Sequence, residues 1–401
     1  MPASEHVSRP DNTEDGSSGQ AARPSVFLAA GEASGDWAGA LLAHALHQRK
    51  PDLILRGIGG PRMAAAGVAL IADSSDWGAI GVFEAARKAP RAWRALRTAR
   101  AHLQALTPSG IVLIDCGAFN IPLARWAQHR RIPMLYYLPP GSWSRSLRSP
   151  ELPRLVDIIA TPFEWSADLL AGGRARVEWV GHPAVEVARP SRPPADAWRL
   201  YELDPAQPVV ALAPGSREQE MRYVLPVLAR AAQVLARDRE GIQFLVPVAQ
   251  GVDKERVRQA FGSLEPGTRL LGGMDYNALQ LAGAAAVCSG TATLEFACLR
   301  VPMVVVYRAS RVTTLQFRLL RGLIRRQRWA AMPNIIANHQ VVTELLGSAA
   351  TPRAVADELS ALLAGSVRSQ RTRSDLDEVV RDLGPARATR RTAELVLELI
   401  R

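Results

Sequence analysis

The chain has 401 residues, of which 48% are hydrophobic and 22% charged. This length allows two or three domains, and the composition excludes both a disulfide-stapled mini-protein and a wholly disordered chain. The formal net charge of +11, carried almost entirely by arginine, predicts attraction to nucleic acid, phospholipid or a phosphorylated substrate, although a GC-rich genome would give the same enrichment.

The first half of the chain predicts an α/β domain over residues 25–187. Residues 1–24, rich in Ser, Gly, Pro, Asp and Asn, are expected to form a disordered leader. Short apolar runs then alternate with amphipathic stretches, which is typical of buried parallel strands between helices in a doubly wound, Rossmann-like sheet. The runs lie at residues 26–30, 53–58, 110–114, 134–138 and 155–160.

The second half predicts another domain of the same kind over residues 209–365. A stretch rich in Pro and Arg, residues 188–208, separates the two and is expected to be a linker, because this composition favours neither strand nor helix. Helices are expected over residues 366–401, and their return to the first domain is left open. Two such sheets place a cleft between the carboxyl ends of their strands. The apolar runs lie at residues 209–213, 244–248, 269–271, 285–288 and 303–307.

The first predicted strand runs directly into the sequence Gly31-Glu32-Ala33-Ser34-Gly35-Asp36. Its glycines allow close backbone approach, and the start of the following helix offers N–H groups to an anion or a hydroxyl. The alternative is an ordinary helix cap in which Ser34 or Asp36 satisfies these groups.

Asp115 ends the apolar run 110–114 and is therefore placed at the mouth of the first domain. A carboxylate is costly to bury without a partner, so a sequence that places one there usually uses it. We predict that Asp115 is a general base, with a helix cap as the alternative.

The second domain carries two further candidate turns. Pro214-Gly215-Ser216-Arg217 follows its first strand, and glycine and serine N–H groups beside a guanidinium suit a diphosphate. Ser289-Gly290-Thr291-Ala292-Thr293-Leu294-Glu295 ends a strand and opens a helix, where the hydroxyls can meet phosphate and Glu295 can accept both hydroxyls of a ribose. Helix capping is the alternative for both turns. His182 follows a strand and contacts either a ligand or the core.

The sequence predicts no metal and no cofactor. Cys116, Cys288 and Cys298 have no metal-ligand spacing and are typical of a reducing cytosol, and Asp375-Leu376-Asp377 lies in a charged helical stretch that we expect to be solvated. The charge of a departing diphosphate would then be met by Arg217 and by helix N-termini. Nucleic acid is a poorer partner, because no helix-turn-helix, zinc or RNP pattern is present.

Two basic amphipathic stretches are candidates for an anionic membrane surface. Arginines recur every three or four residues in both, and such helices lie at the headgroup boundary of a bilayer. A helix that packs on the core with its arginines in water is the alternative. The residues are Arg87, Arg91, Arg94 and Arg97 with Trp93 in the first, and Arg318, Arg321 and Arg325 in the second.

Taken in order, the motifs of the chain resemble those of the lipid-A-disaccharide synthase family, inverting glycosyltransferases with two Rossmann-like domains in the GT-B architecture. The resemblance runs from about residue 26 to about residue 364. Besides the turns quoted above, it includes Gly59-Gly60-Pro61-Arg62-Met63, Ile80-Gly81-Val82-Phe83-Glu84, Phe119-Asn120, Thr161-Pro162-Phe163-Glu164, Val180-Gly181-His182-Pro183, Pro302-Met303-Val304-Val305-Val306-Tyr307-Arg308 and Met332-Pro333-Asn334.

This resemblance implies transfer of 2,3-diacylglucosamine from UDP-2,3-diacylglucosamine to 2,3-diacylglucosamine 1-phosphate, with release of UDP. Asp115 would remove the proton of the acceptor 6-hydroxyl, and UDP would lie on Arg217, the 289–295 turn and Asn334. The basic stretches would hold the protein to the inner face of the cell membrane as a cytoplasmic, peripheral enzyme and attract the acceptor phosphate. Homo-oligomerisation is left open.

Two departures from the family pattern face the expected acceptor side. Gly117-Ala118 stands where the family continues with Pro-Asp, and residues 139–145, Pro-Pro-Gly-Ser-Trp-Ser-Arg, replace a Pro-x-x-Trp-Ala-Trp-like run. They leave open a diverged relative with another acceptor, an epimerase, or a non-catalytic protein that binds sugar nucleotides or lipid.

Overall fold

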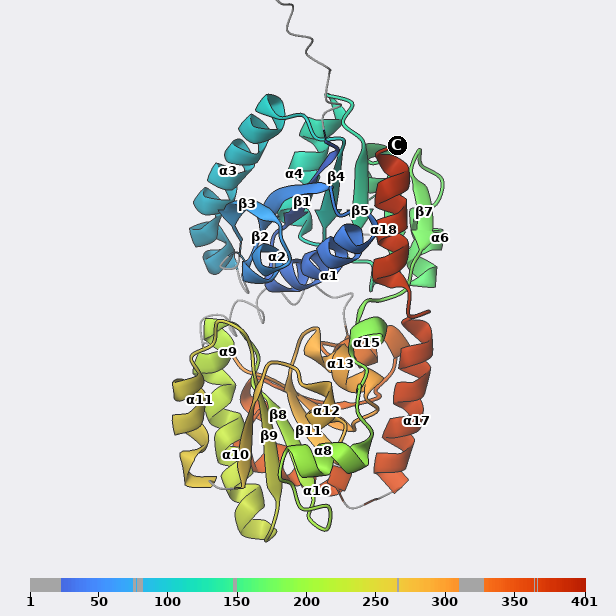
Figure 1. Cartoon of the computed structure of the whole chain (residues 1–401). Coiled ribbons are helices and arrows are strands. Elements are labelled where there is room, and N and C mark those ends of the chain that lie inside the picture. The colour runs from blue at the N-terminus through green and yellow to red at the C-terminus, as the bar shows by residue number, and fades with distance from the viewer. Residues whose placement is uncertain are drawn as a thin grey trace, which may run out of the picture.

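The computed structural model describes residues 23–74, 77, 82–146, 150–264, 267–309, 328–363, 365 and 367–401, with the backbone alone for residues 82–89. Two α/β domains follow one another along the chain and stack end to end (Figure 1). Within these residues, none of the helices combines the length and apolarity needed to cross a bilayer. Almost all of the expected leader lies outside the described residues.

The first domain is built on a seven-stranded parallel sheet with the order β3-β2-β1-β4-β5-β6-β7. The order reverses beside β1, so β1 and β4 flank the point where ligands bind in open sheets of this type. Its strands are β1 (Ser25–Ala30), β2 (Ile54–Gly59), β3 (Ala69–Asp73), β4 (Gly110–Ile114), β5 (Met134–Tyr137), β6 (Ile158–Thr161) and β7 (Arg176–Trp179). Its helices are α1 (Ala33–Arg49), α2 (Pro61–Ala65), α3 (Val82–Ala105), α4 (Gly117–Gln128), α5 (Leu152–Leu155), α6 (Glu164–Leu170) and α7 (Ala184–Val187).

The second domain has a six-stranded parallel sheet with the order β10-β9-β8-β11-β12-β13, which again reverses between its first and fourth strands. Its strands are β8 (Val209–Ala213), β9 (Gln243–Val248), β10 (Thr268–Gly272), β11 (Ala284–Cys288), β12 (Met303–Tyr307) and β13 (Thr343–Leu346). Its helices are α8 (Pro194–Leu200), α9 (Glu218–Tyr223), α10 (Leu225–Asp238), α11 (Lys254–Phe261), α12 (Tyr276–Leu279), α13 (Ala292–Cys298), α15 (Met332–Ala337), α16 (Pro352–Leu363) and α17 (Val367–Asp382), and α18 (Ala388–Leu399) ends the chain.

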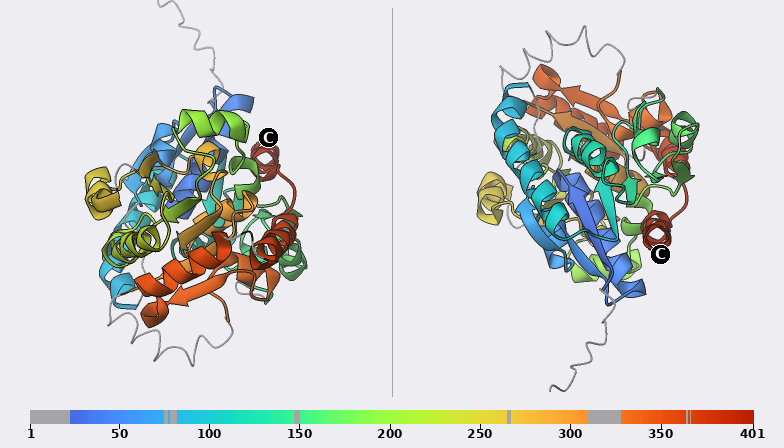
Figure 2. Two further views of the ribbon diagram at one scale, coloured as in Figure 1. Left: turned by 90° about the horizontal axis from the view of Figure 1, so that it is seen from below. Right: turned by 90° about the horizontal axis from the view of Figure 1, so that it is seen from above.

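Helices cover both faces of each sheet, as views along the long axis show (Figure 2). Side chains of a strand alternate between faces, so Val26 and Leu28 of β1 pack with α1 and α18, whereas Phe27 packs with α3 and α4. Both sets are buried. The central strands therefore have no polar face, which explains why their apolar runs are continuous.

The edge strands β3, β7 and β13 were not among the predicted runs. Their side chains are half-buried or exposed, so their sequences, such as Arg-Val-Glu-Trp in β7, lack a continuous apolar run. The expectation that residues 188–208 form neither strand nor helix was wrong in one part. Pro193 and Pro194 begin α8, because proline at the first turn of a helix loses no hydrogen bond, and α8 buries Ala197 in the core of the second domain.

The chain passes between the domains twice, and the two passages lie side by side. The backbone N–H of His182, in the first passage, donates to the carbonyl of Leu383 in the second at 2.8 Å. Gly181 has a φ of +88°, and a Cβ there would overlap the Pro385 carbonyl oxygen. Only glycine combines this backbone conformation with such a close approach.

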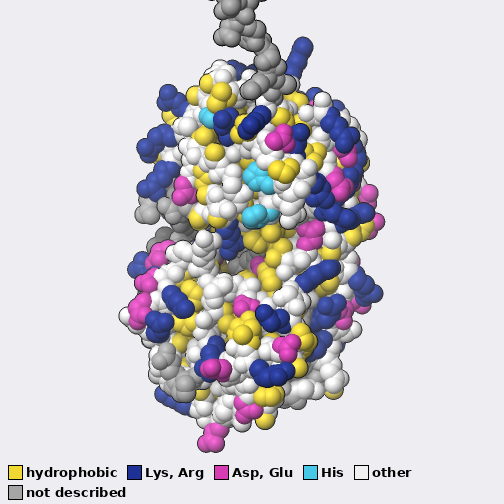
Figure 3. All heavy atoms as spheres, in the orientation of Figure 1, with side chains coloured by type: hydrophobic (Ala, Val, Ile, Leu, Met, Phe, Trp, Pro, Cys, Tyr) yellow, Lys and Arg dark blue, Asp and Glu magenta, His cyan; other side chains and the backbone are white. Residues whose placement is uncertain are grey.

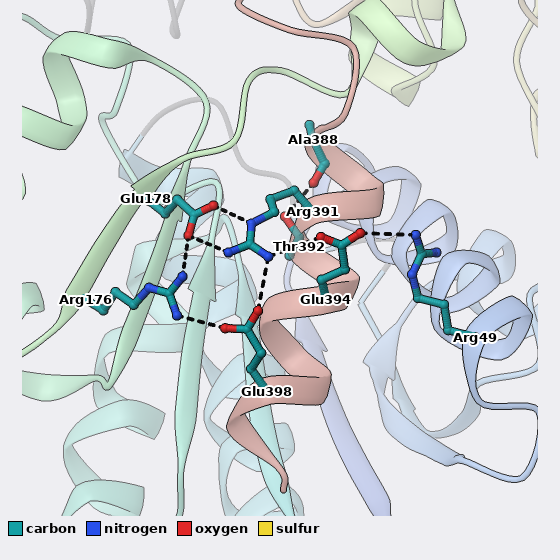
Figure 4. Close-up of polar contacts among 8 residues, drawn as sticks. All are labelled: Arg49, Arg176, Glu178, Ala388, Arg391, Thr392, Glu394 and Glu398. Atoms are coloured by element: carbon teal, nitrogen blue, oxygen red, sulfur yellow. Dashed lines mark hydrogen bonds and ion pairs between the residues drawn. The ribbon is translucent and has the colours of Figure 1, made fainter.

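Helix α18 returns to the first domain, where it packs on α1 and β5. Ion pairs join its polar face to the sheet edge and to α1 (Figure 4). Arg391 pairs with Glu178 of β7 and, at 3.1 Å, with both Glu394 and Glu398 of its own helix. Arg176 of β7 contacts Glu398 at 2.8 Å. The network therefore covers the exposed edge strand with the end of the chain.

We expect Arg391→Ala to lower the free energy of unfolding by about 1–2 kcal/mol, because its guanidinium joins three carboxylates and is only 22% exposed. Urea unfolding at pH 7 measures the loss. The hydrogen bond from Arg391 lowers the pKa of Glu178. The stabilisation is therefore present above the carboxyl pKa of the unfolded chain and is lost as the pH falls through the lower folded value.

Arg371→Ala is the matched control, because Arg371 is 83% exposed and pairs only loosely with Asp375, at 3.9 Å. We expect it to change the free energy of unfolding by less than about 0.5 kcal/mol. Equal losses in the two variants would contradict the stabilising role of the α18 network.

Candidate active site at the domain junction

The carboxyl ends of the central strands of both sheets meet at the junction between the domains. Glu32 follows β1 and Arg217 follows β8, and the Arg217 Nη2 lies 3.5 Å from the Glu32 Oε2. Burial raises the pKa of Asp115, which follows β4, and the charge of Arg217 is among the influences that oppose this rise. The predicted base and the predicted diphosphate arginine, 102 positions apart in sequence, are therefore neighbours across the junction.

Asp115 is held in an unusual backbone conformation by a set of local hydrogen bonds. Its φ is +50° and that of Cys116 is +32°, in the left-handed region that non-glycine residues seldom adopt. The hydroxyl of Tyr136 and the side-chain amide of Asn120 donate to the Asp115 carbonyl oxygen, at 2.6 and 3.0 Å. These bonds offset the strain and turn the carboxylate toward the junction, where the Ser34 hydroxyl donates to its Oδ2 at 2.9 Å.

Burial raises the pKa of the Asp115 carboxyl above its ordinary value, and it is the largest influence on this group. The Ser34 hydroxyl, the backbone N–H of Cys116 and the charge of Arg217 act in the opposite direction. A carboxylate in this setting is a stronger base than one in water, and it remains next to a cation of the other domain.

The turn of residues 31–36 divides into a part that faces Asp115 and a part that supports the fold. Ser34 belongs to the first part. Asp36 belongs to the second, because its buried carboxylate accepts three backbone N–H bonds, from Gly60, Arg62 and Met63, and so begins α2. Asp36 belongs to the turn expected to meet an anion or a hydroxyl, and in the structure its carboxylate binds backbone groups of the fold.

The two glycines of this turn permit close packing. A Cβ at Gly31 would overlap the Cys116 side chain, and one at Gly35 would come within 3.4 Å of the Ile114 carbonyl oxygen. Both glycines thus bring β1 and α1 against the end of β4, which places Ser34 beside Asp115.

The loop Gly215-Ser216-Arg217 already holds an anion, the carboxylate of Glu220. Its Oε2 accepts the backbone N–H groups of Ser216 and Arg217, at 2.7 and 2.9 Å, and its Oε1 pairs with the Arg217 guanidinium at 3.2 Å. Gly215, at a φ of +105°, leaves room for this carboxylate. The predicted backbone cradle is thus occupied from within the chain, and the guanidinium of Arg217 is the part that faces the junction.

Some of the groups that the sequence predicted to bind a ligand in the turn of residues 289–295 lie beside open space. Others are bonded to the chain itself. Ser289 donates to the Ala330 carbonyl oxygen at 3.0 Å, and the fully buried Thr293 donates to the Gly290 carbonyl oxygen at 2.7 Å. Gly290 is the open part, because a Cβ built there meets nothing within 4 Å. Thr291 beside it is half-buried and begins α13.

Glu295 is 7% exposed, and the hydroxyl of Tyr276 donates to its Oε2 at 2.6 Å. Burial raises the pKa of Glu295, and the charge of Arg62, from the first domain, acts against this rise. Arg62 therefore faces the second domain, although its motif had suggested no role. The sequence predicted no role for Tyr276 either, because no pattern in its own segment points to Glu295.

The side chains of Asn334 and His182 both form hydrogen bonds with other residues of the chain. Asn334 is fully buried, its amide donates to the Val342 carbonyl and to Glu344, and its carbonyl accepts from the backbone of Val341 and Val342. These bonds involve both polar atoms of the Asn334 side chain, and its contact with UDP stays a prediction. The Nδ1 of His182 accepts the Ala184 N–H at 3.1 Å, and the ring packs near Phe163 where the chain passes between domains.

The two departures from the family pattern contact each other. A Cβ at Gly117 would lie 2.8 Å from Pro140 Cγ, so the glycine accommodates the second proline of the changed run. Arg145 from the same run stacks on Trp165 and donates to the Ile336 carbonyl oxygen of the second domain at 3.0 Å. The changed segment therefore forms a contact between the domains.

The first basic stretch lies on α3, at the outer edge of the first domain, where Figure 3 shows many Lys and Arg side chains. Arg91, Trp93 and Arg94 are exposed. The side chain of Arg87 lies outside the described residues, as does the second stretch with Arg318, Arg321 and Arg325. Across the part of the chain that is described, no group of three or more His, Cys, Asp or Glu residues is placed to hold a metal ion.

The two reversing parallel sheets, with their polar turns facing each other, form the GT-B fold. MurG of Acinetobacter baumannii shares this fold at a TM-score of 0.55 and 14% identity, over 94% of this chain and 99% of that one. The UDP-GlcNAc 2-epimerase of Neisseria meningitidis, solved with UDP-GlcNAc, shares it at a TM-score of 0.60 and 10% identity, over 93% and 100%.

Sequence comparison narrows this class to one family. The model of the lipid-A-disaccharide synthetase family matches residues 26–399. The lipid-A-disaccharide synthases of Syntrophus aciditrophicus and Coxiella burnetii are 35% and 33% identical, each over 94% of this chain and 98% of the relative. The chain belongs to this family of glycosyltransferases.

We expect the imidazole of His182 to remain neutral down to acid pH, because burial lowers its pKa from 6.5 to about 4. The unfolded chain takes up a proton on this residue first. The contribution of the neutral His182 ring to the stability of the folded state is therefore complete above pH 6.5. It is lost as the pH falls toward 4. NMR titration of the ring measures the pKa, and His182→Asn, which keeps an acceptor, should remove this part of the pH dependence of unfolding. A ring that titrates near 6.5 would contradict the burial argument.

Proposed function

We propose that this chain transfers 2,3-diacylglucosamine from UDP-2,3-diacylglucosamine to the 6-hydroxyl of 2,3-diacylglucosamine 1-phosphate, with inversion and release of UDP. The observation that carries the proposal is the position of Asp115, a carboxylate held by Ser34 beside Arg217 of the opposite domain. Membership in the lipid-A-disaccharide synthetase family supports the choice of substrates.

Asp115 acts as the general base in this proposal. It takes the proton from the acceptor 6-hydroxyl as that oxygen attacks the anomeric carbon of the donor. The new bond forms on the face opposite the departing diphosphate, so a single displacement gives a β-1,6 linkage. Burial raises the pKa of Asp115, which matches the carboxylate better to an alcohol proton.

The second domain binds the donor and accepts the charge of the leaving group. As the bond between the anomeric carbon and the diphosphate oxygen breaks, negative charge gathers on UDP, and the guanidinium of Arg217 is placed to meet it. Gly290 offers its backbone groups beside open space, and the half-buried Thr291 follows it at the start of α13. Glu295, oriented by Tyr276, is the candidate partner for the ribose hydroxyls.

The exposed arginines of α3 are proposed to hold the enzyme at the anionic inner face of the cell membrane. Acyl chains of both substrates then stay in lipid while their sugars reach the domain junction. Trp93, 59% exposed, is a large apolar side chain of this helix that points outward. The same arginines attract the phosphate of the acceptor.

We expect Asp115→Asn to lower the rate of UDP release by about 10²–10⁴-fold, because the variant lacks the base. Purified protein with UDP-2,3-diacylglucosamine and the monosaccharide phosphate is the assay. When the wild-type rate is measured against pH, the pKa of the acid limb should lie above the ordinary carboxyl range, because burial raises the pKa of Asp115. Ser34→Ala should shift this limb to still higher pH, because it removes a hydrogen bond to the ionised form.

A wild-type protein that releases no UDP from these two substrates would contradict the proposed reaction. A rate that Asp115→Asn leaves unchanged would contradict only the role of Asp115.

We expect the double variant Arg91→Glu, Arg94→Glu to bind vesicles that contain anionic phospholipid about tenfold or more weakly than wild type. Vesicle flotation measures binding, and binding by wild type should weaken as salt rises. The matched control is Arg199→Glu, Arg371→Glu, which makes the same charge change at exposed positions of α8 and α17. Equal losses in both double variants would contradict a specific role for α3.

A further inference from the structure

The first domain contains a cavity of about 370 Å³ between the end of β3 and helix α3, which lie next to each other at one edge of the domain (Figure 1). This volume lies within the range of pockets that take small ligands. Asp73 and Trp77 line the cavity on the side of the sheet, and Arg91, Arg94 and Thr98 line it from the helix. The cavity thus lies at the carboxyl end of a parallel strand, where open sheets of this type bind their ligands.

The spacing of residues on α3 directs two of its arginines to this cavity. Arg91, Arg94 and Ala95 are separated by three or four positions and therefore share one face of the helix. Ala95 also lines the cavity, and its small side chain leaves space between the helix and the sheet. Arg97 instead stacks on Trp93 of the same helix, with its guanidinium 5.0 Å from the ring centroid. Only part of the basic stretch therefore faces the cavity.

The two guanidinium groups at the cavity lack a carboxylate partner within the described part of the chain. Neither Arg91 nor Arg94 forms an ion pair there, and the Nε of Arg94 donates to the carbonyl oxygen of Pro90 in its own helix at 3.4 Å. By contrast, Arg125 and Arg174 of the same domain pair with carboxylates at 2.7 and 3.0 Å. Two neighbouring cations repel each other, and a phosphate between them accepts hydrogen bonds from both. The arrangement therefore favours an anionic ligand.

The indole ring of Trp77 is held in place by the fold. The buried Ser74 hydroxyl donates to the carbonyl oxygen of Ala30, the last residue of β1, at 2.7 Å. The backbone N–H of Trp77 donates to the Ser74 carbonyl oxygen at 3.0 Å, and its ring lies 4.9 Å from that of Phe119 in α4, measured between centroids. Trp77 is half-buried, so part of it packs on the protein and part lines the cavity. Such an apolar surface suits the C–H groups of a sugar ring.

The same ring brings the cavity next to the proposed base. A Cβ built at Gly31 would lie 3.7 Å from the Trp77 ring and would overlap the Cys116 side chain, so the two side chains flank one glycine. Asp115 directly precedes Cys116 in the chain. A sugar whose phosphate lies in the cavity would therefore extend past Trp77 toward Asp115.

We propose that this cavity is the subsite for the sugar phosphate of the acceptor. The phosphate lies on Arg91 and Arg94, and the sugar packs on Trp77 with its 6-hydroxyl toward Asp115. This inference rests on the proposed function, because it takes its ligand from the proposed acceptor. It adds recognition of one phosphate monoester to the attraction already proposed for α3.

Titration of the full chain with glucosamine 1-phosphate, without vesicles or detergent, tests this proposal, because neither acyl chains nor a membrane then contributes to binding. Calorimetry measures the affinity. Glucosamine, which lacks the phosphate, should bind about tenfold or more weakly, since it forms no charge-assisted bond with arginine. Arg91→Gln and Arg94→Gln should each weaken the binding of glucosamine 1-phosphate about three- to tenfold.

Arg130→Gln is the matched control, because Arg130 is an exposed arginine of the same domain that stacks on a tryptophan, Trp126, and does not line the cavity. It should bind glucosamine 1-phosphate as wild type does. Trp77→Leu should weaken this binding about threefold or more and leave that of glycerol 3-phosphate unchanged, because only the sugar meets the ring. Unchanged affinity for UDP checks that each variant is folded.

The possible failures are distinguishable. Arginine variants that bind glucosamine 1-phosphate as tightly as wild type overturn the proposal, and so does a wild-type protein that binds glucosamine equally well. Glycerol 3-phosphate that binds as tightly as glucosamine 1-phosphate also overturns it, because the cavity would then suit the phosphate of a phospholipid headgroup. A wild-type protein that binds glucosamine 1-phosphate as expected but releases no UDP from the two proposed substrates overturns the proposed function and leaves the sugar-phosphate site standing.

Discussion

The chemistry proposed for this protein depends on one electrostatic relation, that of Arg217 in the second domain with the carboxylates of the first. Neither domain holds both the proposed base and the cation. Asp115 and Glu32 follow strands of one sheet, Arg217 follows a strand of the other, and only the stacking of the two sheets places them together. Because charges interact strongly when partly removed from water, this arrangement links the position of the domains to the basicity of Asp115.

Several features of the fold maintain that arrangement. The chain passes between the domains twice, and the passages are bonded to each other through His182 and Leu383. The final helix, α18, is fixed to the first domain by the Arg391 network after α17 has packed on the second. Arg145 adds a contact from the changed segment of residues 139–145. The two domains are therefore joined by backbone bonding between the passages and by side-chain contacts such as that of Arg145 with Ile336.

Buried polar side chains in this protein divide into those that support the site and those that face it. Asp36, Glu220 and Asn334 each satisfy two or more backbone groups and are almost completely enclosed. Asp115 and Glu295 each accept one side-chain hydroxyl, from Ser34 and Tyr276. The difference follows from the cost of leaving a buried hydrogen-bonding group unpaired. A carboxylate or amide that satisfies several backbone groups is therefore costly to withdraw from them.

The sequence by itself determined the two-domain α/β class, the central strands and the turns that carry the site, because strands buried on both faces need continuous apolar runs and parallel sheets bring polar turns to their carboxyl ends. Edge strands such as β7 were not recognised, since partly exposed strands tolerate charged residues and lack that pattern. Only the tertiary structure decided which polar residues of each motif face the junction. Ser34 and Asp36 stand two positions apart in one helix, yet one contacts Asp115 and the other begins α2. The partner of a side chain depends on what the rest of the chain brings near it, and local spacing does not contain that information.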